Sequence, residues 1–324
     1  MLCIAPETAG VTLLLALALD GLVGDPGWLY RRVPHPVVLI GRAIAAGERR
    51  LNRAGRGERA RILAGTGLTA AVVAGAAAIG LALHGMLAAL PHAWPLEAVL
   101  ASTLLAYRGL YDAVRRVAES LGNSLAEGRG AVAVLAGRDT RGMDEAAVAR
   151  AGVESAAENL ADGVVAPAFW YLVLGLPGIL AYKAVNTLDS MLGHRDERHA
   201  AFGRAAARLD DVASWPCARL TALLLCLGGV FVGGARPDRA LWTAVRDARR
   251  HRSVNAGWPE AAMAGALGFA LAGPRSYGGE SVPDAWMGRG RAALTPADVH
   301  RALTLYVAAG GVLAVAVGGL TLAV

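Results

Sequence analysis

The chain has 324 residues, of which 55% are hydrophobic and 18% are charged, and its formal net charge is +6. Soluble domains carry about a quarter charged residues, so this composition excludes an ordinary soluble domain and indicates an integral membrane protein. Its positive charges are almost all arginines in segments beside apolar runs. That is the positive-inside pattern of membrane proteins, and it disfavours nucleic acid as a partner.

Apolar segments alternate with basic ones along the chain. The first, residues 9–24, is predicted to be a short helix that ends at Asp25, because a residue before proline avoids helical geometry. Residues 62–90 contain no Asp, Glu, Lys or Arg and are long enough to cross a bilayer, which takes about 20 apolar residues. Five further apolar segments follow, at residues 96–110, 164–182, 216–234, 261–273 and 299–324.

The longest polar stretch covers residues 112–163, and we expect it to be a cytoplasmic segment within a single helical membrane domain, residues 1–324. Its last part, residues 143–162, is predicted to form a helix. The apolar segment that follows, residues 164–182, is interrupted by proline and glycine. Broken membrane segments of this kind often line a cavity, and a kinked span is the alternative.

Four arginine-rich stretches all have the character of cytoplasmic segments, and simple spans cannot leave all of them on one side of the membrane. Either one apolar segment is re-entrant or one basic stretch violates the rule. The expected fold class is therefore all-α: a polytopic helical integral membrane protein with broken or re-entrant helices and polar cytoplasmic segments.

Three carboxylates, Glu154, Glu158 and Asp162, recur at four-residue spacing just before an apolar segment, with Asn159 beside them. On a helix this spacing places them along one stripe. Acidic groups at a membrane boundary are costly unless they bind something, and Mg²⁺ prefers such oxygen ligands. The alternative is a solvated acidic face paired with arginines such as Arg150.

A second polar group follows the apolar segment. Lys183, Asn186 and Ser190 fall on one helix face, and Asp189 flanks them. A lysine in this position can hold a phosphate, and Asp189 could complete a metal site with the earlier stripe. A lysine that extends toward the membrane surface beside a capping aspartate is the alternative.

Other candidate residues lie in segments that proline or glycine makes rigid or tightly turned. Asp25, His35 and Arg42 could hold an anion and a metal ion at a membrane edge, or they could form a rigid turn whose arginines meet lipid headgroups. Weaker candidates for substrate contact come later in the chain: Arg204, Asp210, Asp211, Asn255, Glu260, Tyr277 and Glu280. The chain has no Walker-type phosphate loop.

In this order, the segments GLVGDPGWLYRRVPHPVVLIGR, ESAAENLADGVVAPAFW, AYKAVNTLDSMLGH and FGRAAARLDDVASWP resemble the CbiB/CobD family of cobalamin biosynthesis, and so do NAGWPE and YGGE. The resemblance covers nearly the whole chain. It implies an adenosylcobinamide-phosphate synthase, a membrane ligase that uses ATP to join adenosylcobyric acid to (R)-1-aminopropan-2-ol or its O-phosphate. It also implies a multi-pass protein of the bacterial inner membrane with its site facing the cytoplasm. Beyond the lipid bilayer, a second copy of the chain or another late corrin-pathway enzyme would be its partners.

Residue roles follow from physical chemistry applied to the matched motifs. ATP would convert the carboxylate into an acyl phosphate, which the amine then attacks. Three carboxylates are expected to hold Mg²⁺: Glu158, Asp162 and Asp189. Lys183 and Arg204 are expected to neutralise phosphate, and Glu154 is the candidate base. The remaining candidates are expected to bind substrate.

Two other functions stay open. The spacing of Asn186 and Asp189 faintly resembles the Asp-rich motif of transferases that act on a lipid or polyprenyl phosphate, although the further Asp of that motif is absent. A corrin or ion transporter is favoured by the broken apolar segment, although the chain shows no two matched halves. ATP consumption that requires both a corrin acid and an amino alcohol would distinguish the ligase from both alternatives.

Overall fold

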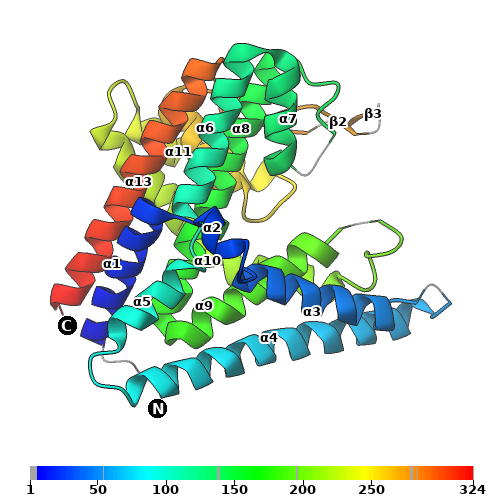
Figure 1. Ribbon diagram of the computed structural model, residues 1–324. Coiled ribbons are helices and arrows are strands. Elements are labelled where there is room, and N and C mark those ends of the chain that lie inside the picture. The colour runs from blue at the N-terminus through cyan, green and yellow to red at the C-terminus, as the bar shows by residue number, and fades with distance from the viewer. Residues whose placement is uncertain are drawn as a thin grey trace. The chain divides into compact units, whose positions relative to one another are not determined.

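The computed structural model describes residues 6–53, 55–136, 139–194, 196–277, 280–282 and 284–323, and most of them are helical, as the sequence predicts (Figure 1). The chain divides into two compact units. Unit 1 comprises Met1–Ala106, Ala166–Ser214 and Val317–Val324, and unit 2 comprises Tyr107–Val165 and Trp215–Ala316. Each unit is therefore assembled from segments that lie far apart in the sequence.

Unit 1 is built largely from helices. They are α1 (Pro6–Val23), α2 (Gly27–Tyr30), α3 (Pro36–Leu51), α4 (Glu58–Ala88), α5 (Trp94–Ser102), α9 (Ala166–Leu192) and the first part of α10 (Arg204–Gly228). Helix α3 begins where His35 caps it by accepting a hydrogen bond from the Val37 N–H. The buried side chains of Ile44, Leu188 and Phe202 belong to the core between α3, α4 and α9.

Helix α9 is broken, as the proline and glycine of its sequence predict. Gly175 has φ 67°, in the left-handed region that favours glycine, and Pro177 follows it inside the helix. Gly80 of α4 lies against this break, since a Cβ atom added there would be only 2.7 Å from the Leu176 carbonyl oxygen. The absence of a side chain at Gly80 therefore lets α4 pack directly on the irregular backbone of α9.

Unit 2 combines helices with two short antiparallel ribbons. Its helices are α6 (Tyr107–Asn123), α7 (Leu125–Ala136), α8 (Glu145–Leu160), the rest of α10, α11 (Pro237–Asp247), α12 (Gly257–Leu267) and most of α13 (Pro296–Ala323). Strand β1 (Leu271–Ala272) pairs with β4 (Trp286–Met287), and β2 (Arg275–Tyr277) pairs with β3 (Glu280–Val282). Helix α12 is the buried centre of this unit, because nearly all of its side chains are covered.

Among the described residues, four helical runs are long and apolar enough to cross a membrane: Glu58–Ala88, Glu145–Leu192, Arg204–Phe231 and Pro296–Ala323. The protein is thus a membrane protein, as its composition indicates. Three of the apolar segments do not coincide with single helices. The helix that contains most of the segment 216–234 already begins at Arg204, the segment 96–110 is divided between α5 and α6, and the segment 261–273 continues beyond α12, which ends at Leu267.

Candidate functional site

A buried polar cluster in unit 1 joins the second half of α9 to the first half of α10. The Tyr182 hydroxyl lies 3.1 Å from Ser214 Oγ, which in turn donates to Asp210 Oδ2 at 3.4 Å. Asn186 also hydrogen bonds to Asp210, and the Asp189 carboxylate lies near enough for the two acids to repel each other. Asp210 is only 9% exposed. Two carboxylates and an amide therefore meet among apolar helices.

The other predicted residues of this region are placed differently. Lys183 is buried, whereas Ser190 is exposed and donates back to the Asn186 carbonyl of its own helix. Asp211 is exposed, although its charge still acts on Asp189. Arg204 pairs with Glu58 at 2.9 Å on the surface. The structure thus brings Asn186, Asp189 and Asp210 into one cluster and turns Ser190 and Arg204 toward solvent.

The donor atoms of this cluster suit a hard cation, because they are carboxylate and amide oxygens. Within the described part of the chain, no three His, Cys, Asp or Glu side chains gather as a metal site. A magnesium ion at Asp189 and Asp210 would therefore rely on water and phosphate oxygens for its remaining ligands, which is the usual arrangement for Mg²⁺ beside a nucleotide.

The predicted acidic stripe on α8 lies in unit 2, and its members differ in exposure. Glu154 is buried, and its carboxylate accepts a hydrogen bond from the Ala272 N–H at 2.8 Å, which ties strand β1 to α8. Glu158 is exposed, and Asp162 is half-buried in a π-helical turn, Ala161–Val165, that interrupts the α-helical spacing. Asn159 donates to a carbonyl of its own helix. The three predicted magnesium ligands therefore divide between the two units.

Of the three candidates Asp25, His35 and Arg42, the structure brings the first two together. His35 Nε2 lies 3.5 Å from Asp25 Oδ1, and Tyr30 packs edge-on against the imidazole ring. Burial and the neighbouring Asp25 raise the pKa of Tyr30 to about 12. Arg42 is exposed and makes no ion pair with these groups in the part of the chain that the structure describes.

Sequence reasoning missed a second buried network in unit 1. Glu97 of α5 accepts a hydrogen bond from the Tyr171 hydroxyl at 2.8 Å and lies 3.1 Å from His84 Nδ1. Glu97 is only 6% exposed. The available signal was a lone carboxylate in the apolar segment 96–110, since ionisable groups in such segments are costly without partners.

In unit 2, Asn255 hydrogen bonds to a wall residue of an aromatic pocket. The Arg219 guanidinium lies 4.5 Å from the ring centre of Trp215 and 4.8 Å from that of Trp258. It also donates to Asn255 Oδ1 at 2.7 Å. Trp215, Arg219 and Trp258 line a cavity of about 480 Å³, together with His251. A cation held between two indoles offers flat apolar surface next to positive charge.

The last three predicted residues, Glu260, Tyr277 and Glu280, also belong to unit 2. Glu260 is 2% exposed, and its Oε1 lies 3.6 Å from His251 Nε2. Tyr277 and Glu280 pair as backbone neighbours across the β2–β3 ribbon, and their side chains fall outside the described part of the structure. Glu260 is therefore one half of a buried acid–histidine pair.

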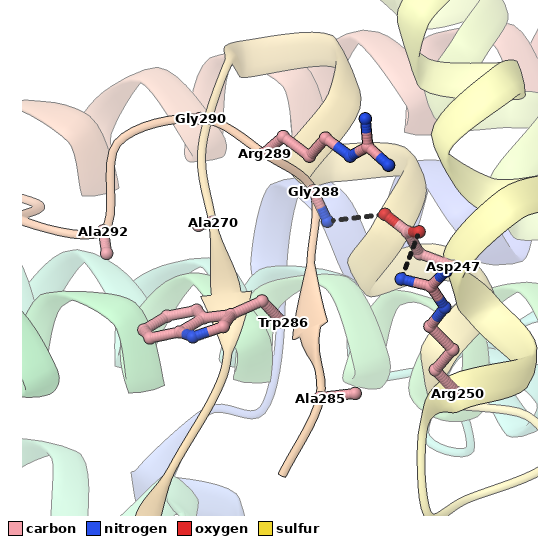
Figure 2. A pocket seen from close by; sticks show the side chains of 9 residues that line it. All are labelled: Asp247, Arg250, Ala270, Ala285, Trp286, Gly288, Arg289, Gly290 and Ala292. Carbon is pink, nitrogen blue, oxygen red and sulfur yellow. Dashed lines mark hydrogen bonds and ion pairs between the residues drawn. The ribbon is translucent and has the colours of Figure 1, made fainter.

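A charged centre that the sequence did not single out lies at the end of α11. Asp247 accepts a hydrogen bond from the Gly288 N–H at 3.0 Å, and Arg250 lies 3.6 Å away (Figure 2). It also accepts a hydrogen bond from Arg246 Nε at 2.7 Å. Burial opposes ionisation of Asp247, but these hydrogen bonds and positive charges keep its pKa below the ordinary value. The adjoining cavity measures about 550 Å³, with Trp286 and Arg289 among its walls.

Comparison with known proteins agrees with the resemblance seen in the motifs. The model of the family described as "CobD/Cbib protein" matches residues 13–306. A Cobalamin biosynthesis protein CobD of Sinorhizobium sp is 49% identical over 319 residues, covering 96% of this chain and 99% of that protein. The Rhizobium meliloti protein of the same name is 46% identical, covering 93% of each chain, and that of Rhodobacter capsulatus is 44% identical, covering 91% of each. No solved structure matches the chain. The chain therefore belongs to the CobD/CbiB family of cobalamin biosynthesis proteins.

Proposed function

We propose that this protein is an ATP-dependent ligase. It forms the amide between adenosylcobyric acid and (R)-1-aminopropan-2-ol or its O-phosphate, giving adenosylcobinamide or its phosphate. Membership of a cobalamin biosynthesis family supports this assignment. The observation that carries it is the meeting of Asp189 and Asp210 beside Asn186 among apolar helices. Such a pair is costly unless a bound cation balances it, as a magnesium–nucleotide complex would.

The chemistry requires activation, because a carboxylate anion resists attack by an amine. A carboxylate oxygen of the corrin takes the γ-phosphoryl group of ATP, and ADP leaves. The amine nitrogen then attacks the acyl carbon, phosphate leaves, and a base removes one proton from the nitrogen. Phosphoryl transfer is catalysed mainly by positioning and charge neutralisation, which is work for the charged side chains of this protein.

Asp189 and Asp210 are the proposed magnesium ligands of unit 1, and Glu158 and Asp162 are those of unit 2. An ion bound at either pair would neutralise phosphate oxygens. The fit rests on the oxygen donors at Asp189 and Asp210 and on the position of Asp162 in a π-helical turn, a feature common at functional sites. Alanine at Glu158 or Asp162 is expected to abolish amide formation while the protein still folds.

Three further side chains take roles in binding and proton transfer. Lys183, the only lysine of the chain, is buried on α9 and is proposed to neutralise phosphate, with Arg204 assisting from the surface. Glu154 is the proposed base, and the Ala272 N–H orients its carboxylate. We place the protein in the bacterial inner membrane with this site on the cytoplasmic side, where ATP is available.

The proposal is tested by incubating the purified protein with adenosylcobyric acid, Mg-ATP and one form of the amine at a time. Mass analysis should find the amide product and ADP only when all substrates are present. Running free aminopropanol and its O-phosphate in parallel identifies the amine that the enzyme uses. ATP turnover that ignores the corrin acid and the amine would count against a ligase.

One observation favours the transporter alternative, namely the break at Gly175 in α9. Broken helices in transporters expose backbone groups to a substrate at mid-membrane. The same break is also explained by close packing, since Gly80 of α4 lies directly against it. Uptake of labelled corrin into vesicles without ATP consumption would support transport over ligation.

A further inference from the structure

A third cavity of unit 2 adjoins the Asp247 centre. It measures about 570 Å³, within the range of small-molecule sites. Helices α11 and α12 and the turn after β4 form its walls, and it shares Arg289 and Gly290 with the cavity of Figure 2. Its most distinctive lining residues are Arg239, Trp242, Arg246, Phe269, Arg289 and Gly290. It is therefore a pocket with several guanidinium groups and an aromatic wall.

The charges around this cavity do not balance. Arg246 is paired with Asp247, and the lining carboxylate Asp238 is paired with Arg236 at 3.2 Å. Arg239 and Arg289 have no acidic partner among the residues that the structure describes. Two guanidinium groups thus remain in excess, and the planar donor fork of arginine matches the oxygens of a phosphate group.

The surrounding backbone holds the cationic walls in place. The Asp247 carboxylate ties α11, which carries Arg239, to Gly288, which directly precedes Arg289. Gly288 has φ 86°, and a side chain there would collide with the Phe269 carbonyl oxygen. The backbone that carries Arg289 is therefore fixed by an acid at one side and by close packing at the other, while the side chains of Arg239 and Arg289 are exposed.

The aromatic wall offers a stacking surface. Trp242 lines the cavity and is 59% exposed, and the Arg246 guanidinium lies 4.3 Å from its ring centre. A flat heterocyclic base can stack on an exposed indole, whereas a simple phosphate or a lipid headgroup gains nothing from it. We propose that this pocket binds a nucleoside triphosphate, with its phosphates on Arg239 and Arg289 and its base on Trp242. This inference goes beyond the proposed function, because it assigns a nucleoside triphosphate to a pocket of unit 2, whereas Lys183 and the proposed magnesium ligands Asp189 and Asp210 belong to unit 1.

The test measures binding of the non-hydrolysable analogue AMP-PNP to the full-length protein in phosphatidylcholine nanodiscs. Arg239→Ala and Arg289→Ala should each weaken the affinity roughly ten- to a hundredfold, because each removes hydrogen bonds to a charged group. Trp242→Leu should weaken AMP-PNP but leave the affinity for inorganic triphosphate unchanged. The matched control is Arg141→Ala, which removes a 90% exposed arginine of the same unit that pairs with Asp139 outside the pocket, and it should bind normally.

Retained melting temperature and gel-filtration profile show that the variants are folded. Unchanged AMP-PNP affinity in the Arg239→Ala, Arg289→Ala double variant would overturn the inference. So would loss of binding when phosphatidylglycerol enters the nanodisc, because the pocket would then be a lipid phosphate site. Amide formation separates the two claims. A wild-type enzyme that makes the amide with ATP, with nucleotide binding unaffected in the double variant, refutes only the pocket. A wild-type protein that consumes no ATP refutes the ligase itself.

Discussion

The carboxylate of Asp247 accepts a hydrogen bond from the backbone N–H of Gly288 at 3.0 Å. The bond connects the last residue of α11 to the residue after β4. The same carboxylate pairs with Arg246 and Arg250. One buried acid therefore joins two arginines and a glycine turn beside the proposed nucleotide pocket.

Replacing Asp247 by alanine should destabilise the protein by about 1–3 kcal/mol, because a buried N–H and a half-buried guanidinium lose their acceptor. Asp247→Asn keeps an acceptor for Gly288 and should cost less. Thermal melting in detergent measures both. Asp139→Ala, which breaks only the exposed pair with Arg141, serves as the comparison and should change little. Equal effects of Asp139→Ala and Asp247→Ala would argue against a structural role for Asp247.

The pH dependence of this centre follows from the lowered pKa of Asp247. A carboxyl group with a depressed pKa in the folded state adds stability above its unfolded pKa, about 3.9, and this stability is lost as the pH falls through the folded pKa. The melting advantage of the wild type over Asp247→Asn should therefore be constant from about pH 7 to 5 and shrink below about pH 4. An advantage that disappears near pH 6 would mean that a different group is responsible.

Gly80 and Gly75 of α4 should respond to alanine with opposite signs. A Cβ atom at Gly80 would press on the Leu176–Pro177 backbone at 2.7 Å, whereas one at Gly75 meets nothing within 4 Å. Gly80→Ala should therefore lose about 1–3 kcal/mol through overpacking, and Gly75→Ala should gain a few tenths to about 1 kcal/mol from helix propensity. Melting curves of the two variants decide the matter. Stabilisation by both would show that α4 does not pack on the break of α9.

Neutralising the acids of the α9–α10 cluster should remove activity without unfolding the protein. Asp189→Asn and Asp210→Asn are each expected to lower the rate of amide formation by about 10²- to 10³-fold, because charge stabilisation of the phosphoryl group is lost. Raising the magnesium concentration should restore part of this rate. Asp196→Asn is the control, since asparagine still caps the turn at His199 and the residue lies outside the cluster. Near-normal turnover in both cluster variants would refute their assignment.

The buried contact between Tyr171 and Glu97 should contribute measurably to stability. Tyr171→Phe removes the donor of a 2.8 Å hydrogen bond and leaves part of a buried carboxylate unsatisfied, at a cost of about 1–3 kcal/mol. Ser102→Ala removes an exposed hydroxyl that bonds only within α5, and it should be close to neutral. Equal melting temperatures of the two variants would show that the hydrogen bond between Tyr171 and Glu97 does not stabilise the protein.

The features that could be predicted from the sequence are those that depend only on residues close together in the chain. The uncharged run of residues 62–90 became α4 (Glu58–Ala88), because length and hydrophobicity suffice to specify a spanning helix. The break in α9 was predicted for the same reason, since Gly175 and Pro177 act on their own backbone. Asn186 and Asp189 lie on one helical turn, as their spacing predicts. Their contact with Asp210 was not predictable from spacing, because Asp210 belongs to a different helix.

Contacts between distant residues were not predictable from local patterns. Asp247 lies in a basic stretch that is typical of a cytoplasmic loop, and its partner Gly288 is 41 residues away. Tyr171 and Glu97 are separated by 74 residues. The stripe of Glu154, Glu158 and Asp162 assumed an ideal helix, but a π-helical turn shifts the last member and strand β1 engages the first. Spacing along a chain fixes which face a residue occupies only while the helix stays regular.

The central claim, ATP-driven amide formation, is tested most directly by a stoichiometry measurement on the purified wild-type protein. With adenosylcobyric acid, the amine and Mg-ATP supplied together, one ADP should form for each amide detected by mass, and omitting either organic substrate should stop both. ATP hydrolysis that continues without them, or amide that accumulates without ADP, would contradict the proposed function.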